Sequence, residues 1–289
     1  MSSIPTVRTI ADLRGRIRAW RAEGVRIALV PTMGALHAGH LSLIGLARQK
    51  ATRVVASLFV NPTQFAPTED FHSYPRDEQR DAALLRAAGC DLLYAPDPDE
   101  MYPDGFATTV MVAAETTSLE GAVRPDHFAG VATVVAKLLI QVAPDVAVFG
   151  EKDYQQLHVI RRLTADLDLA VEIIGAPIVR DGDGLALSSR NAYLSARERV
   201  IAPSLHRALE AAAAALRAGT AVARVEAEAI HSVLSAGFES IDYVEVRSAD
   251  RLARLGPGPL DGTARLLAAA RILGAARLGR TRLLDNIEV

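Results

Sequence analysis

The sequence predicts an α/β protein in which a parallel β-sheet carries helices on both faces and a smaller C-terminal α+β domain follows. Short, almost entirely apolar runs alternate with amphipathic segments up to about residue 179, as is typical of strands buried on both sides. Polar loops follow four of these runs, and the pattern changes after Val179. Since 289 residues suffice for two modest domains, we expect domains at residues 1–178 and 179–289.

The composition favours a folded protein with a sizeable core. It argues against a disordered protein, a strongly basic nucleic-acid binder, a disulfide-rich protein and a membrane protein. Half of the residues are apolar and 23% are charged, which argues against disorder. A net charge of -2 argues against nucleic-acid binding through bulk electrostatics. Cys90, the single cysteine, cannot form an intrachain disulfide and is expected in the core. No signal peptide is evident, and charged or polar residues interrupt the apolar region 131–149, so we expect a cytoplasmic protein without a membrane span.

The first elements are a helix, a strand and a second helix. Thr9 can cap a helix whose apolar residues recur at helical spacing up to Gly24. The apolar run 25–30 predicts a strand, and an amphipathic segment after residue 41 predicts a helix that reaches about Lys50.

The next elements follow the same alternation. Residues 53–60 are short, apolar and rich in β-branched side chains, which predicts a strand. Residues 61–65 form a polar loop that Pro62 keeps out of a helix. A helix at 75–88 and a strand at 91–95 are then expected.

The middle of the chain is less regular up to residue 124, where we expect only a strand at 108–112. An apolar helix at 128–142 and a strand at 146–149 follow. Another helix opens at residue 150 and carries an apolar stripe to Leu163, and the last strand of the sheet spans 171–179.

The C-terminal part has a different pattern. Residues 180–184 form a turn-rich hinge, and alanine-rich helices are expected at 203–217 and 222–234. A strand at 241–246 and an apolar stretch at 265–272 complete a smaller α+β domain.

The loop after the first strand carries two histidines three residues apart, His37 and His40, with Gly39 between them. At a helix start they share one face, and the unpaired N–H groups there favour phosphate. Imidazoles in this place can stabilise charge during phosphoryl or nucleotidyl transfer. Two histidines could instead bind a metal, but zinc needs a third protein ligand, which only a remote part of the sequence could supply.

Polar loops follow the strands that end at Val30, Val60, Phe149 and Val179. Parallel strands end at one edge of a sheet, and ligands bind there, so we expect one composite site. The second pair of loops carries cations: Lys152 opens a helix, and Arg190 follows Ser188 and Ser189. These groups suit phosphate, although acidic residues at a helix start and a hydroxyl helix cap are purely structural alternatives.

Neutral amides at the strand ends suit a substrate with hydroxyl and carboxylate groups. They are Asn61, Gln64, Gln155 and Gln156. The sequence contains no Gly-x-Ser-x-Gly elbow, no Gly-x-x-x-x-Gly-Lys-Ser/Thr loop, and no Gly-x-Gly-x-x-Gly after the first strand. These absences argue against a triad hydrolase and a dinucleotide oxidoreductase.

Five motifs, in this order, resemble the pantothenate synthetase family of the nucleotidyltransferase superfamily that includes class I aminoacyl-tRNA synthetases. They are PTMGALH at 31–37, FVNPTQF at 59–65, RPDHFAG at 124–130, FGEKDYQQ at 149–156 and SSRN at 188–191. The resemblance spans the chain from the first strand to the hinge, and the length fits the family.

The resemblance implies a Rossmann-like N-terminal domain, a C-terminal lid domain, a homodimer, and ATP-dependent joining of pantoate to β-alanine through pantoyl adenylate, with Mg²⁺ on the ATP phosphates rather than on side chains. The implied ATP-binding residues are Met33, Gly34, Ala35, Leu36, His37, Ala38, Gly39, His40, Gly150, Glu151, Lys152, Asp153, Val179, Leu187, Ser188, Ser189 and Arg190. Those implied to bind pantoate or β-alanine are Asn61, Gln64, Arg124, His127 and Gln156. The implied catalytic residues are His37, His40, Lys152, Ser188, Ser189 and Arg190.

Two positions depart from the family pattern. Leu187 stands where methionine is usual, a volume-conserving change, and Ala122-Val123 stand where glycine is more usual, which predicts a stiffer flap. Two other functions compete: another nucleotidyltransferase, and a non-catalytic nucleotide- or RNA-binding module. The Gln64 and Gln156 motifs argue against the first, and the intact cations and near-zero net charge argue against the second.

Overall fold

The computed structural model describes residues 3–67, 69–113, 116–260, 263–272 and 281–289, and it forms two compact units. Unit 1 comprises Met1–Glu151 and Val159–Pro177, and unit 2 comprises Lys152–His158 and Ile178–Val289. Residues 152–158 thus group with the C-terminal part of the chain. The predicted division into domains at residues 178 and 179 stays a prediction.

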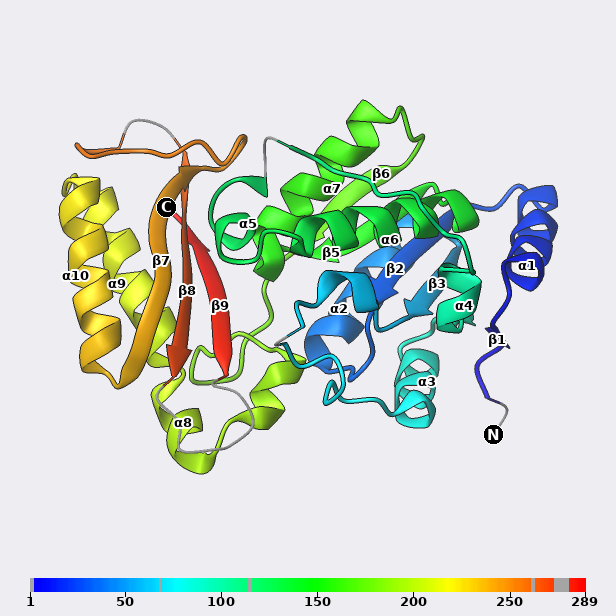
Figure 1. Ribbon diagram of the computed structural model, residues 1–289, viewed down its shortest axis with the longest axis horizontal. Helices are drawn as coiled ribbons and strands as arrows, with labels where there is room; N and C mark the ends of the chain where they lie inside the picture. Colours follow the sequence, from blue (N-terminus) through cyan, green and yellow to red (C-terminus); the bar gives the residue numbers. More distant parts are fainter. Residues whose placement is uncertain (1–2, 68, 114–115, 261–262, 273–280) are drawn as a thin grey trace. The chain divides into compact units, whose positions relative to one another are not determined.

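Unit 1 contains a six-stranded sheet with the order β1-β4-β3-β2-β5-β6, in which every pair of neighbours is parallel (Figure 1). The strands are β1 (Thr6–Val7), β2 (Ile27–Thr32), β3 (Arg53–Leu58), β4 (Leu92–Tyr94), β5 (Val146–Gly150) and β6 (Glu172–Ala176). The predicted parallel sheet is confirmed, with the two-residue β1 as an addition.

Both faces of this sheet are buried. Ala28 and Val30 of β2 belong to a core cluster with α2, while Ile27 and Leu29 point to the opposite face and are equally buried. The helices that begin in unit 1 are α1 (Ile10–Ala22), α2 (Ala38–Lys50), α3 (Glu78–Ala87), α4 (Pro98–Met101), α5 (Glu120–Val123) and α6 (His127–Val142). Cys90 lies in the same core, and burial raises the pKa of its thiol to about 11, which confirms the predicted core role.

Two local predictions are wrong. Residues 108–112 form no strand, because the N–H of Val110 donates to the Thr133 hydroxyl of α6 at 3.0 Å rather than to a neighbouring strand. The segment 61–65 is more than a loop, since Pro62 begins the 3-10 helix η1 (Pro62–Gln64). Proline suits a first helical position because its missing N–H has no partner there.

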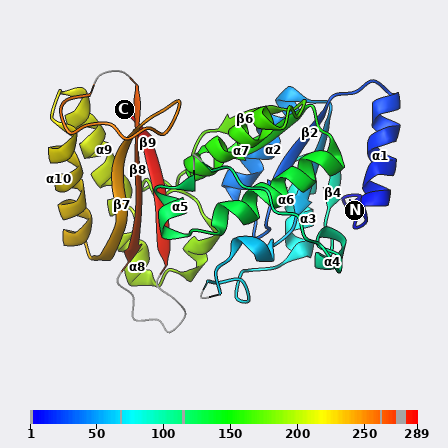
Figure 2. The ribbon, with the colours of Figure 1, turned by 45° about the horizontal axis from the view of Figure 1, so that its top comes forward.

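Unit 2 contains an antiparallel sheet with the order β7-β8-β9 and two helices, α9 and α10, along it (Figure 2). The strands are β7 (Phe238–Ser248), β8 (Ala264–Ile272) and β9 (Arg282–Glu288). The helices are α8 (Ala196–Ile201), α9 (Ser204–Arg217) and α10 (Val222–Ser235). Helix α7 (Tyr154–Asp166) has its residues up to His158 in unit 2 and the others in unit 1. The predicted α+β character and both alanine-rich helices are confirmed, whereas α8 and β9 were not predicted.

The strand order places the loops after β2 and β5 together. The chain passes from β2 to β3 and β4 on one side, then crosses to β5 and β6 on the other, so the order reverses between β2 and β5. Ligands of open α/β sheets bind at such a reversal, beyond the carboxyl ends of the strands. Within the described residues, no helix has the length and apolar character needed to cross a membrane.

Candidate active site

The loop between β2 and α2 has an unusual backbone that a buried carboxylate holds. Gly34 has a φ of +89° and Ala35 a φ of +51°, so the chain turns through the left-handed region. The Asp81 carboxylate of α3 accepts hydrogen bonds from the N–H groups of Ala35 at 2.8 Å and Leu36 at 2.9 Å. A side chain at position 34 would crowd Asp81, which is why glycine is needed there.

Asp81 was missed in the sequence, where an acidic residue near a helix N-terminus looks like an ordinary dipole partner. Its side chain is fully buried, unlike those of the other charged residues of helix α3. One signal was available: Asp81 and Leu85 are four residues apart on α3 and are its two buried residues. A carboxylate on the apolar face of a helix indicates a specific buried partner.

His37 and His40 cap helix α2 with their own imidazoles. The Nδ1 of His37 accepts from the Gly39 N–H at 3.2 Å, and the Nδ1 of His40 accepts from the His37 N–H at 3.4 Å. Their ring centroids are 4.1 Å apart. Because each Nδ1 is an acceptor, each neutral ring carries its proton on Nε2. The helix N-terminus therefore presents two imidazole Nε2–H donors in addition to its backbone dipole.

The η1 turn organises the predicted substrate amides around Asn61, which is buried. The Nδ2 of Asn61 donates to Gln64 Oε1 and to the Gly130 carbonyl, both at 3.1 Å, and its Oδ1 accepts from the Tyr102 hydroxyl at 2.8 Å. Gln64 in turn directs Nε2 to the Met33 sulfur at 3.0 Å. Asn61 thus positions Gln64, and Gln64 faces the loop after β2.

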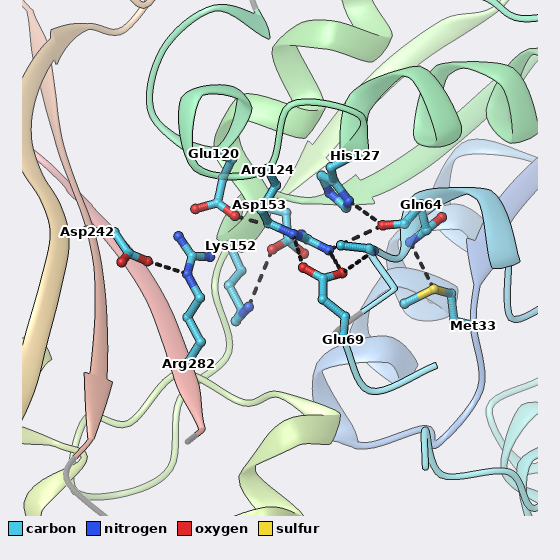
Figure 3. A network of polar contacts seen from close by, with 11 residues as sticks. Met33, Gln64, Glu69, Glu120, Arg124, His127, Lys152, Asp153, Asp242 and Arg282 are labelled. Carbon is cyan, nitrogen blue, oxygen red and sulfur yellow. Dashed lines mark hydrogen bonds and ion pairs between the residues drawn. The ribbon is translucent and has the colours of Figure 1, made fainter. Parts of the chain in front are cut away.

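Helix α6 packs so closely on η1 that only glycine fits at position 130. A Cβ there would clash with the backbone of Thr63. The close approach brings His127, the first residue of α6, to the Gln64 carbonyl, where its Nδ1 lies 2.9 Å from the oxygen (Figure 3). Since a carbonyl can only accept, Nδ1 carries the proton and Nε2 is an acceptor in the neutral ring.

Burial lowers the pKa of His127 to about 4, and the nearby Arg124 charge acts in the same direction. The ring is therefore neutral at pH 7. Arg124 itself binds Glu69 through two hydrogen bonds of 2.6 and 2.7 Å and donates to the Gln64 carbonyl at 3.3 Å. Burial alone would raise the pKa of Glu69, but the hydrogen bonds and charge of Arg124 outweigh it and lower that pKa.

Glu69 is the second residue that sequence reasoning missed. It lies 55 residues before Arg124 in a segment without regular structure, so no spacing pattern connects the two. Both side chains are largely buried, at 15% and 24% exposure for Arg124 and Glu69. The predicted substrate residue Arg124 thus already has a carboxylate partner. Ala122 and Val123, where the family has glycine, lie just before it in the short helix α5.

The remaining predicted cations lie in unit 2. Lys152 belongs to the 3-10 helix η3 (Glu151–Asp153), and its Nζ lies 3.4 Å from Asp153 Oδ1 (Figure 3). Ser188 caps the 3-10 helix η4 (Ser189–Tyr193), which contains Arg190, by accepting from the Arg190 N–H at 3.3 Å. Ser188 therefore has the structural role of a helix cap that was the alternative to phosphate binding. Gln156, on α7, is partly exposed.

The backbone of Val179 is tied to the segment that contains Leu187, since the Val179 carbonyl accepts from the Leu187 N–H at 3.0 Å. Leu187 is partly buried. The further predicted residues Ala38, Gly39, Gly150 and Glu151 lie at the strand-to-helix junctions after β2 and β5. Among the described residues, no group of three or more His, Cys, Asp and Glu side chains is arranged to bind a metal ion.

Known proteins with a similar sequence cover the whole chain. Residues 5–288 match the family model described as pantoate-beta-alanine ligase. The chain is 58% identical to a pantothenate synthetase of Caulobacter vibrioides, with 100% of both chains covered. It is 59% identical to that of Paramagnetospirillum magneticum, covering 100% of this chain and 99% of the relative.

Solved structures agree with the sequence relatives. A crystal structure of pantothenate synthetase from Thermus thermophilus has a TM-score of 0.90 at 47% identity, covering 98% of this chain and 99% of that chain. A pantoate-beta-alanine ligase from Francisella tularensis, crystallised with Beta-gamma ATP and beta-alanine, has a TM-score of 0.79 at 32% identity, covering 99% and 97%. The family match, the identities and the shared fold lead to one conclusion. The chain belongs to the pantoate-beta-alanine ligase family.

Proposed function

We propose that this protein joins pantoate to β-alanine in two steps, through pantoyl adenylate, with release of pyrophosphate and then AMP. The observation that carries the proposal is the N-terminus of α2, where His37 and His40 add imidazole donors to a helix dipole beside the sheet reversal. This arrangement suits a triphosphate whose charge increases during reaction.

In the first step, a pantoate carboxylate oxygen forms a bond to the α-phosphorus of ATP, and the bond from that phosphorus to the bridging oxygen of pyrophosphate breaks. Negative charge grows on the phosphate oxygens and the leaving group. Donors that are fixed beforehand stabilise this charge without reorganising during the reaction. We assign this role to the Nε2–H groups of His37 and His40 and to the backbone from Met33 to His40.

Gln64 is proposed to bind pantoate. Asn61 holds the amide oxygen, while the amide nitrogen donates to a methionine sulfur, which is a weak acceptor. An oxygen of the substrate is a better acceptor, so pantoate can replace the sulfur without any loss to the protein. Gln156 is proposed as the second pantoate amide.

In the second step, the β-alanine amine forms a bond to the pantoyl carbonyl carbon, AMP leaves with the bridging oxygen, and the amine releases a proton. The amine must be neutral to attack. His127 contributes a neutral ring with an acceptor Nε2, which suits a hydrogen bond from an N–H or O–H of the substrates. Arg124 is proposed to bind a substrate carboxylate, for which the Glu69 carboxylate stands in.

The residues of unit 2 complete the proposal. Lys152, Ser188, Ser189 and Arg190 are assigned to the ATP phosphates, and Asp153 to the ribose. The Val179 backbone is assigned to the adenine, and Leu187 to closure over the phosphates. Mg²⁺ is proposed to arrive with ATP, because it keeps several waters and is commonly held by substrate phosphates. It would neutralise phosphate charge when bound.

A homodimer in the cytoplasm is part of the same proposal. Met111 is 76% exposed and lies in the segment 107–113, which pairs with no strand among the described residues, so its apolar side chain is available for contact. A second copy of the chain could cover it. Light scattering that gives the mass of one chain at micromolar concentration would remove the dimer from the proposal.

The test of the reaction is pyrophosphate release from ATP and Mg²⁺, first with pantoate alone and then with β-alanine. We expect limited release with pantoate, which accelerates on addition of β-alanine as AMP and pantothenate form. Release that does not depend on pantoate would contradict the adenylate step. A product that retains the nucleotide after β-alanine is added would instead support another nucleotidyltransferase.

A further inference from the structure

Two adjacent residues of β9, Asp285 and Asn286, hold both segments of unit 2 to which the proposed function assigns phosphate binding. Both side chains are buried, at 4% and 2% exposure. Each of the two side chains bonds to a segment outside the sheet that lies more than 100 residues away in sequence. Buried polar groups on a strand are costly unless they are fully bonded, so their partners indicate what they do.

Asn286 holds the backbone of Lys152. Its Nδ2 donates to the Lys152 carbonyl at 3.1 Å, and its Oδ1 accepts from Arg265 Nη1 at 2.7 Å. A guanidinium can only donate, so the oxygen of the amide must face Arg265 and the nitrogen must face Lys152. The Arg265 guanidinium also lies over the ring of Tyr154, two residues after Lys152, at 4.0 Å from its centroid. Two contacts from the sheet thus hold η3 and the first residue of α7.

Asp285 holds the start of the segment that leads to Arg190. Its two oxygens accept from Arg180 Nη1 at 2.7 Å and Nη2 at 2.9 Å, a bidentate pair. Arg180 also donates to the Gly184 carbonyl at 3.1 Å and forms an antiparallel bridge with Ala186. The bridge is followed directly by Leu187 and the cap Ser188. Asp285 therefore anchors the turn from which the predicted phosphate loop extends.

Side chains of successive strand residues point to opposite faces, so one dipeptide can serve two segments. The Asp285 Oδ1 also accepts from the Asn286 N–H at 2.8 Å, which couples the two anchors. We propose that Asp285 and Asn286 are positioning residues that fix Lys152 relative to the Ser188–Arg190 segment. The proposal rests on the proposed function, since that function assigns both segments to ATP phosphates.

The sharpest test is Asn286→Asp in the full-length protein. The new carboxylate still accepts from Arg265, but it has no N–H to donate to the Lys152 carbonyl. Losing one such bond is expected to raise the KM for ATP in pantoate-dependent pyrophosphate release by about tenfold. The KM for β-alanine should stay within twofold of wild type. Glu226→Gln is the matched control, because Glu226 is a buried acceptor of the same unit that bonds Val246 and Arg254 instead.

A mutant cycle with Lys152→Ala separates positioning from general stability. If Asn286 acts through Lys152, Asn286→Asp should change the rate by less than twofold in the Lys152→Ala background. An equal loss in both backgrounds, or equal increases in the KM for ATP and for β-alanine, would overturn the proposal. Asp285→Asn is the second variant, which removes the charge that binds Arg180, and it should show the same selective increase in the KM for ATP.

The outcomes distinguish the two proposals. If Lys152→Ala and Asp285→Asn both impair pyrophosphate release and Asn286→Asp does not, the positioning role of Asn286 is wrong and the proposed function stands. If Lys152→Ala has wild-type kinetics, the assignment of Lys152 to phosphate is wrong, and the positioning proposal fails with it.

Discussion

Two strand-to-helix junctions of this protein, after β2 and after β5, combine fold and chemistry in opposite ways. After β2, His37 and His40 form the helix cap with the same imidazoles that are proposed to bind phosphate. After β5, the ammonium of Lys152 bonds only the exposed Asp153 among the described side chains, and the side chain of Asn286 holds the backbone. A functional side chain can thus stabilise the local structure itself, or it can extend from a backbone that other residues hold. Mutations of the first kind should lower both stability and activity, and mutations of the second kind should lower activity alone.

The largest effect expected is on catalysis in Lys152→Ala. Removing one fixed donor to a transition-state oxyanion slows reactions by about 10²- to 10³-fold, and we expect this loss in pantoate-dependent pyrophosphate release. Stability should not change, because an ion pair at the surface contributes little. Thermal unfolding checks this, with Lys50→Ala, at the exposed end of α2, as a control. A large fall in melting temperature in Lys152→Ala would show that the Lys152 side chain also stabilises the fold, which contradicts the difference drawn between the two junctions.

His40→Ala should affect both properties, though unequally. Adenylate formation should fall by about 10²-fold as the Nε2 donor is lost, and the free energy of unfolding should fall by only about 1 kcal/mol with the cap. His40→Asn sharpens the test, because an asparagine oxygen can take over the capping bond, while the shorter amide places no N–H donor at the position of the imidazole Nε2. Equivalent losses of folding and activity in His40→Ala would contradict the assigned role.

Asp81→Ala should act chiefly on stability. It leaves the N–H groups of Ala35 and Leu36 without their acceptor in a buried loop, which should lower the free energy of unfolding by about 2 to 3 kcal/mol. Urea denaturation measures this. The control is Asp77→Ala on the same helix, which removes only a cap to the Arg80 N–H and should cost about 1 kcal/mol. Equal costs would mean that the loop does not depend on Asp81.

The smallest effect concerns His127, an imidazole that caps nothing. Its pKa of about 4 lies below the usual 6.5, so the unfolded chain binds a proton between these pH values and the folded chain does not. The free energy of unfolding should therefore rise with pH from 4 to 6.5, by up to about 2 kcal/mol after discounting for partial exposure. Denaturation at pH 5 and pH 7 tests this, and His127→Gln should lessen the difference. Because the pKa of Glu69 is lowered, most of its titration lies below pH 5 and outside the compared range.

Much of the fold could be predicted because the strands of unit 1 are mostly apolar and are separated by clear helical periods. β9 could not, because Asp285 and Asn286 interrupt its apolar residues and are buried for reasons that lie elsewhere in the chain. The prediction for residues 108–112 was wrong in the opposite sense, because a strand was expected there and none forms. They have the β-branched composition of a strand, but a side chain of α6 takes the Val110 N–H.

The candidate site shows the same limit. Short motifs around His37, Gln64 and Lys152 are visible because the residues that define them are neighbours in sequence. Asp81, Glu69 and Asn286 are much harder to find, since each acts on a partner at least 45 residues away. What holds a site in place is spread over the chain, whereas the groups that face a ligand are concentrated in loops.

The reciprocal cap that His37 and His40 form at α2 occurs in its more usual form at another helix of the chain. Helix α8 begins with a serine and a glutamate, Ser195 and Glu198, and the glutamate accepts from the Ser195 N–H at 2.7 Å, against 3.4 Å for the equivalent bond to His40. Helix α2 could therefore be capped more firmly than it is, but a glutamate there would repel phosphate. Laboratory evolution for thermostability alone would then be expected to replace these histidines early, so a selection on this enzyme has to score turnover together with heat resistance.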